Sequence, residues 1–207
     1  MKIQTHFEEQ LNALSHGIGA VLGVVGLILL MIYGNSSSLE LFSVIVYGLS
    51  IIILFTASTL YHWVKNESLK HYFRIVDHIS IYLLIAGTYT PVTLITLSES
   101  RGWLLFGLVW GIAVIGTILK LFFTGRFGVV STLLYLVMGW LIAFDFSSLV
   151  ESLATNGLLW LFLGGLFYTV GIVFYAIQKI PYNHVIWHLF VLGGAICHFF
   201  MIFFYVI

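Results

Sequence analysis

The chain has 207 residues, of which 61% are hydrophobic and 8% are charged, and its formal net charge is zero. A soluble domain carries roughly 25% charged residues, so this composition predicts an integral membrane protein. Basic residues are confined to loops and helix ends, which leaves no positive face for binding nucleic acid. The single cysteine, Cys197, excludes an intramolecular disulfide.

Seven apolar runs are long enough to cross a bilayer as helices, since about 20 helical residues span a hydrocarbon core of roughly 30 Å. In chain order the predicted helices cover residues 16–33, 41–63, 73–97, 103–123, 128–149, 157–178 and 184–206. The runs are continuous, which favours helices over the alternating strands of a β-barrel. We therefore predict an all-α membrane protein with a cytoplasmic segment over residues 1–15 and one seven-helix transmembrane domain over residues 16–207.

Basic residues are distributed unevenly between the two sides of this predicted bundle. If the N-terminus is cytoplasmic, the outer side holds only Arg101, and the inner side holds Lys2, Lys65, Lys70, Arg74, Lys120, Arg126 and Lys179. Cytoplasmic loops are enriched in Lys and Arg, so we predict a cytoplasmic N-terminus and an external C-terminus. This orientation is the reverse of a G-protein-coupled receptor, and the last helix lacks the lysine that binds retinal in microbial rhodopsins.

Three histidines lie at the cytoplasmic ends of predicted helices. Ionisable residues inside membrane spans are energetically costly, so their presence indicates a functional site. His62 ends the second helix, and His184 and His188 begin the seventh. Because they are four residues apart, His184 and His188 lie on one helical face. Three neutral imidazoles leave the fourth position of a tetrahedral zinc ion open for water. His62, His184 and His188 are therefore the predicted ligands of a zinc ion near the cytoplasmic face.

Two further residues lie at the depth of these histidines. Ser58, one turn before His62, either faces the same centre or returns its hydroxyl to the carbonyl four residues earlier. Asp77, at the start of the third helix, either pairs with Arg74 or accepts a hydrogen bond from the water in the open position and serves as general base. The sequence leaves both alternatives open for each residue.

The other polar residues inside the spans favour structural roles. His16 opens the first predicted helix, and we favour a position at the membrane interface over one behind the metal ligands. His198 lies about 15 Å deeper than His188 along the helix, so we expect it to form a hydrogen bond across the bundle. Asp145 lies near the outer end of its helix, where its carboxylate is expected to reach water. Pro91 predicts a kink in the third helix.

Five motifs extend over nearly the whole chain: E-E-Q-L-N-A-L-S-H-G-I-G-A, S-T-L-Y-H, R-I-V-D-H-I-S-I-Y-L-L-I-A-G-T-Y-T-P, L-Y-L-V-M-G-W and H-V-I-W-H-L-F-V-L-G-G-A-I-C-H-F. Together they resemble the bacterial hemolysin III proteins, the prokaryotic branch of the progestin and adipoQ receptor (PAQR) family. The resemblance implies a seven-helix bundle with a zinc ion held by His62, His184 and His188. It also implies that Asp77 holds the metal-bound water and that Ser58 lies nearby. The wider superfamily includes alkaline ceramidases, whereas the bacterial branch is linked to haemolysis and membrane homeostasis.

Two kinds of function follow from these observations. The first is zinc-dependent hydrolysis of a lipid amide or ester, in which Asp77 takes a proton and Ser58 stabilises the oxyanion. The second is a non-enzymatic role, as a sensor of membrane homeostasis or a haemolytic (cytolytic) protein, with zinc as a structural link. A bis-histidine haem carrier is disfavoured, because two histidines on one helix cannot face each other across a macrocycle. The resemblance to a bacterial family, together with the seven apolar runs, predicts a location in a bacterial inner membrane, with a membrane lipid as substrate or ligand and no oligomeric state indicated.

Overall fold

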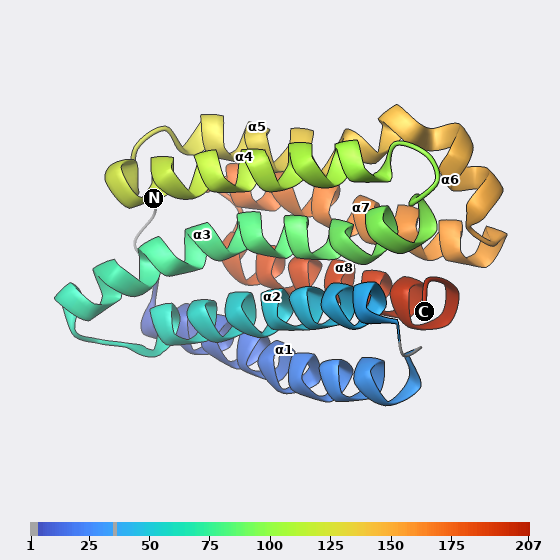
Figure 1. The fold of residues 1–207 in the computed structure, drawn as a ribbon. Coiled ribbons are helices and arrows are strands. Elements are labelled where there is room, and N and C mark those ends of the chain that lie inside the picture. Colours follow the sequence, from blue (N-terminus) through green and yellow to red (C-terminus); the bar gives the residue numbers. More distant parts are fainter. Residues whose placement is uncertain (1–3, 35–36) are drawn as a thin grey trace.

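The fold is that of a helical bundle, seen in a computed structural model that describes residues 4–34 and 37–207. Residues 1–3, which include Lys2, and residues 35–36 lie outside the described part. The described residues form helices and turns and no strand. The long helices run side by side, and α1 begins at one end of the bundle while α8 finishes at the other (Figure 1).

Within residues 4–34 and 37–207, seven helical spans have the length and hydropathy needed to cross a bilayer, which confirms the predicted all-α, seven-helix membrane fold. The third span joins α3 to the π-helix η1, and the fifth joins α5, the 3₁₀-helix η2 and α6. The elements are α1 (His6–Tyr33), α2 (Ser38–Trp63), α3 (Glu67–Pro91), η1 (Val92–Thr96), α4 (Gly102–Phe123), α5 (Gly128–Trp140), η2 (Leu141–Asp145), α6 (Phe146–Ser152), α7 (Thr155–Ala176) and α8 (Asn183–Tyr205). The chain is thus a multi-pass integral membrane protein.

The first helix begins at His6 rather than at residue 16, which is the largest difference from the predicted boundaries. The cause is a reciprocal N-terminal cap. The Glu8 N–H donates to Thr5 Oγ1 at 3.2 Å, and the Thr5 N–H donates to Glu8 Oε2 at 2.7 Å. Hydropathy located only the apolar part of the helix and missed these polar first turns. Their cytoplasmic placement stays a prediction.

The third span changes its helical form at Pro91. The α-helix ends at this residue, where a kink was predicted, and five π-helical residues follow. The start of α3 at Glu67 is also earlier than predicted, because the Asn66 side chain accepts a hydrogen bond from the Leu69 N–H at 3.1 Å. Lys70, which was predicted to precede the third helix, therefore lies in the first turn of α3.

The protein core lies along α2, α3 and α8, where at least half of each span is buried by protein. Only 17% of the fifth span and of α7 is buried in this way, so their outer surfaces face lipid. Small residues let α1 approach α2 closely, as expected in membrane bundles. A Cβ at Gly19 would lie 2.6 Å from the ring of Phe55, which is fully buried.

Asp145 ties two segments together at the end of the bundle predicted to be external, and the prediction that it reaches water is wrong. It is only 5% exposed. One carboxylate oxygen accepts hydrogen bonds from Ser100 Oγ at 2.7 Å and from the Arg101 N–H at 2.9 Å. The other accepts from Ser148 Oγ at 2.7 Å. The carboxylate therefore fixes the loop before α4 to the fifth span.

Candidate metal centre

Three imidazoles converge between α2 and α8. His62 lies in the last turn of α2, and His184 and His188 lie in the first turns of α8. The ring centroid of His62 lies 5.2 Å from that of His184 and 4.8 Å from that of His188. The centroids of His184 and His188 are 4.6 Å apart. One ring nitrogen from each residue lies within 4.8 Å of the others. The predicted convergence of these histidines is confirmed.

The surroundings of the three rings suit a metal ion. His62 is 4% exposed and His188 is 2% exposed. Within the described part of the chain, His62 Nε2 is buried and has no hydrogen-bond partner. A buried nitrogen without a partner is destabilising, and a bound cation would satisfy it. Three imidazole nitrogens are the ligand set of an open zinc site, so the residues fit zinc.

The first turns of α1 contact the outer edges of two of these rings. Glu9 Oε2 lies 2.6 Å from His62 Nδ1, and the carbonyl oxygen of Asn12 lies 3.4 Å from His188 Nδ1. The other oxygen of Glu9 accepts a hydrogen bond from Lys70 Nζ at 2.8 Å. Sequence reasoning missed these residues, because it began the first helix at His16.

His16 lies directly behind one of the candidate ligands. It is buried, its ring stacks on that of His188 at a centroid distance of 3.7 Å, and its Nε2 lies 3.3 Å from the His188 carbonyl oxygen. The ring of Phe55 also packs against His16 in a T-shaped arrangement, with the ring centroids 4.9 Å apart. The favoured interfacial placement of His16 is therefore wrong, and the residue lies behind the candidate ligand His188 instead.

Ser58 is buried one turn before His62 and keeps its hydroxyl available. Among the described residues, Ser58 Oγ has no hydrogen-bond partner. The neighbouring Thr59 instead donates to the Phe55 carbonyl at 2.7 Å. The alternative in which the Ser58 hydroxyl returns to the carbonyl four residues earlier is therefore wrong.

Asp77 lies on α3 and does not belong to the converging set of nitrogens. Its carboxylate is 3.7 Å from His78 Nδ1. No ion pair joins Asp77 to Arg74 within the described ranges, and Arg74 Nε is buried without a partner. The pairing with Arg74 that the sequence allowed is thus absent.

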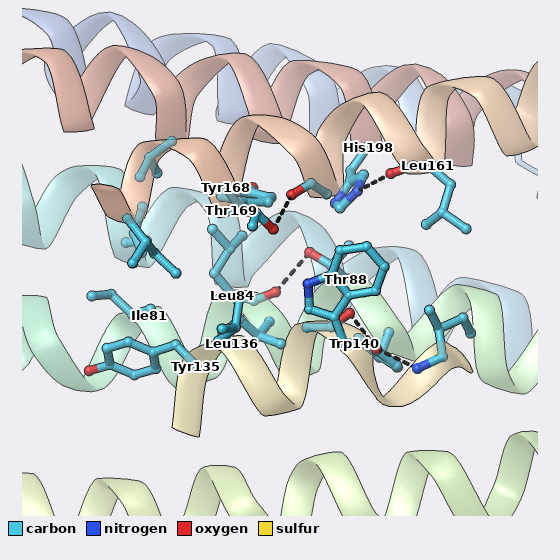
Figure 2. A pocket seen from close by; sticks show the side chains of 18 of the residues that line it. Ile81, Leu84, Thr88, Tyr135, Leu136, Trp140, Leu161, Tyr168, Thr169 and His198 are labelled. Atoms are coloured by element: carbon cyan, nitrogen blue, oxygen red, sulfur yellow. Dashed lines mark hydrogen bonds between the residues drawn. The ribbon is translucent and has the colours of Figure 1, made fainter. Parts of the chain in front are cut away.

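An apolar cavity of about 160 Å³ lies between the central helices and the lipid-facing spans. Figure 2 shows its lining, which includes Leu84, Tyr135 and Tyr168. His198 also lines it, and its Nε2 donates to the Leu161 carbonyl on α7 at 3.2 Å, which confirms the predicted bond across the bundle.

The cavity extends to the neighbourhood of the histidines. Tyr175 and Trp187 line it, and their rings contact each other at 5.4 Å. The ring centroid of Tyr175 lies 6.2 Å from that of His184, so one side chain both lines the cavity and contacts the histidine group.

Known proteins match almost the entire chain. The family model described as haemolysin-III related matches residues 4–199. Hemolysin-3 of Bacillus cereus is 47% identical over 204 residues, which cover 97% of this chain and 92% of that protein. The Hemolysin-3 homolog of Bacillus subtilis (strain 168) is 44% identical over 200 residues, or 96% of this chain and 94% of that protein. The human monocyte to macrophage differentiation factor is 32% identical over 208 residues, or 96% of this chain and 84% of that protein. With these matches at full length and a helical bundle of seven spans, the chain belongs to the haemolysin-III-related family.

Proposed function

We propose that this protein is a zinc-dependent hydrolase that cleaves an amide or ester bond of a membrane lipid at the cytoplasmic face of a bacterial inner membrane. The observation that carries the proposal is the buried group of His62, His184 and His188, which leaves His62 Nε2 without a partner and lies beside an apolar cavity. When bound by these histidines, zinc would supply a Lewis acid and activate water at neutral pH.

Two other side chains have chemistry that suits this reaction. Ser58 has a buried hydroxyl with no partner in the described residues, and it can donate to the negative oxygen that develops on the substrate carbonyl. Asp77 presents a carboxylate on α3, 3.7 Å from His78 Nδ1, and in the proposed reaction it accepts a proton from the attacking water. With an oxyanion donor and a proton acceptor in addition to the metal ligands, the site would hold the groups that hydrolysis requires.

The cavity supports a lipid as the substrate. Its lining is almost entirely apolar and it borders the fifth span and α7, which face the bilayer. An acyl chain buried there gains hydrophobic stabilisation of about 0.8 kcal/mol per methylene. The carbonyl group of such a lipid would lie toward Tyr175 and His184, where the cavity approaches the metal-binding group.

The test is zinc-dependent release of fatty acid by the purified protein from vesicles that contain candidate ceramides or phospholipids. We expect release by the wild type and none above background by His188→Ala. His71→Ala is the matched control, because His71 is an exposed histidine on α3. Equal release by the wild type and His188→Ala would refute the hydrolase.

A second function is supported by the position of the histidines on two different helices. An ion held by His62 of α2 and His184 of α8 would join these spans as a structural zinc, and the protein would then act as a membrane sensor or a haemolytic (cytolytic) protein without catalysis. Structural zinc sites are closed by four protein ligands. An anomalous-scattering map with four protein ligands, together with no lipid cleavage, would favour this function over hydrolysis.

A further inference from the structure

We propose that Glu9 is a positioning residue that orients the His62 imidazole for metal binding, and that Lys70 holds Glu9 in place. The inference rests on the proposed metal centre and adds to it a residue from the first turns of α1. The two nitrogens of an imidazole point to different sides of the ring. When one binds a metal, a carboxylate on the other fixes both the tautomer and the ring rotation.

The contact between Glu9 and His62 has this geometry. Glu9 Oε2 lies 2.6 Å from His62 Nδ1, so the Nδ1–H donates to a carboxylate, and the bond is as short as charge-assisted bonds are. The His62 side chain is fully buried, and its Nε2 is the nitrogen without a partner in the described residues. The carboxylate thus leaves Nε2, not Nδ1, for the ion.

Lys70 completes the arrangement from α3. Its Nζ lies 2.8 Å from Glu9 Oε1, so each carboxylate oxygen has its own partner. Lys70 Nζ also lies 5.4 Å from the centre of the Tyr61 ring. Because Glu9 is only about one fifth exposed, a second bond to Lys70 restricts its rotation away from His62. The chain of contacts joins α3, α1 and α2 outside the ring of ligands.

The neighbouring Glu8 provides a matched control. Its carboxylate accepts from the Thr5 N–H in the helix cap, and glutamine supports the same cap. Glu8→Gln and Glu9→Gln remove the same charge from adjacent positions of the same helix turn. Only Glu9→Gln removes the carboxylate that faces His62.

The experiment measures the zinc affinity of the purified, full-length apoprotein by competition with a chromophoric chelator. We expect Glu9→Gln to weaken zinc binding by about 10–100-fold, the range found when such outer carboxylates are removed. Glu8→Gln is expected to retain the wild-type affinity, and Lys70→Met to lose less than Glu9→Gln. The absorption bands of the Co²⁺-loaded protein provide a second measure. A changed ring orientation shifts these bands, whereas a role limited to stability leaves them in place.

The outcomes separate this inference from the proposed metal centre. If the wild type binds zinc and Glu9→Gln binds it equally well with an unchanged Co²⁺ spectrum, Glu9 has no positioning role. The same conclusion follows if Glu8→Gln loses as much affinity as Glu9→Gln. If the wild type itself binds no zinc, the metal centre is wrong and the inference is lost with it. Lys70→Met leaves both Glu9 and His62 in the chain, so its affinity tests the arrangement even if Glu9→Gln unfolds.

Discussion

Replacing Gly19 with alanine should destabilise the contact between α1 and α2 and disturb the metal centre behind it. The new Cβ would lie 2.6 Å from Cδ1 and 2.8 Å from Cγ of the Phe55 ring. Phe55 is enclosed, and its ring packs against His16, which stacks on His188. Because Phe55 has almost no exposed surface, its ring has no free space to move into, and α1 must move away from α2 to relieve the overlap.

The size of the effect follows from these distances. Carbon atoms in contact are about 3.5–4.0 Å apart, so the added methyl overlaps the ring by roughly 1 Å. Overpacking of this kind costs about 1–3 kcal/mol. A Cβ at Gly17, two residues earlier, would lie 3.7 Å from Thr59 Cγ2, which is an ordinary contact. Both variants share the helix-forming gain of about 0.5–1 kcal/mol from alanine, so their difference isolates the overlap.

The assay is thermal unfolding of Gly19→Ala and Gly17→Ala in the same detergent, followed by circular dichroism. A difference of about 1–3 kcal/mol corresponds to a melting temperature roughly 2–12 °C lower for Gly19→Ala in a chain of this length. Zinc affinity should fall in Gly19→Ala and stay constant in Gly17→Ala. Adding Phe55→Leu to Gly19→Ala should restore part of the loss. Equal melting temperatures for the two glycine variants would refute the packing argument.

Two further results are expected. Removing the metal with a chelator should lower the melting temperature of the wild type but not that of His62→Ala. The reason is that an ion that binds only the folded state stabilises it by about 4 kcal/mol when its concentration is about 1,000 times its Kd. An equal decrease in both proteins would contradict the assigned ligands. Gly165 lines the cavity and has open space where a Cβ would lie, so Gly165→Leu should reduce fatty-acid release while zinc affinity stays constant. The control is Gly111→Leu, which adds the same side chain on the exposed face of α4. Unchanged fatty-acid release by Gly165→Leu would exclude this cavity as the acyl-chain site.

The spans and the three converging histidines could be predicted because each depends on position along a helix. The length of an apolar run determines whether a helix crosses the bilayer. The distance of a residue from the end of that run determines its depth, so His62 and His184 could be placed at the same level before their helices were known to be neighbours. The i, i+4 spacing then placed His188 on the same face as His184.

The contacts of α1 could not be predicted in the same way. Thr5 and Glu8 form a capping signal that is visible in the sequence and would have placed the helix start correctly. That Glu9, and not Glu8, faces His62 depends on the rotation of α1 about its axis, which follows from packing such as that of Gly19 against Phe55. Ser58 and Asp77 show the same limit, because spacing alone left two partners open for each and only tertiary contacts excluded one.

The fifth span and α7 close one side of the cavity, and protein buries little of either helix. Their outer support is therefore supplied by lipid tails, whose lateral pressure acts directly on this wall. A thinner or more fluid bilayer changes the force on these two helices more than on α2 and α8, where the histidines lie and at least half of each span is buried by protein. The dimensions of the cavity thus depend on the surrounding membrane as well as on the chain. A detergent micelle exerts a different lateral pressure from a bilayer, so the cavity should differ in size between the two.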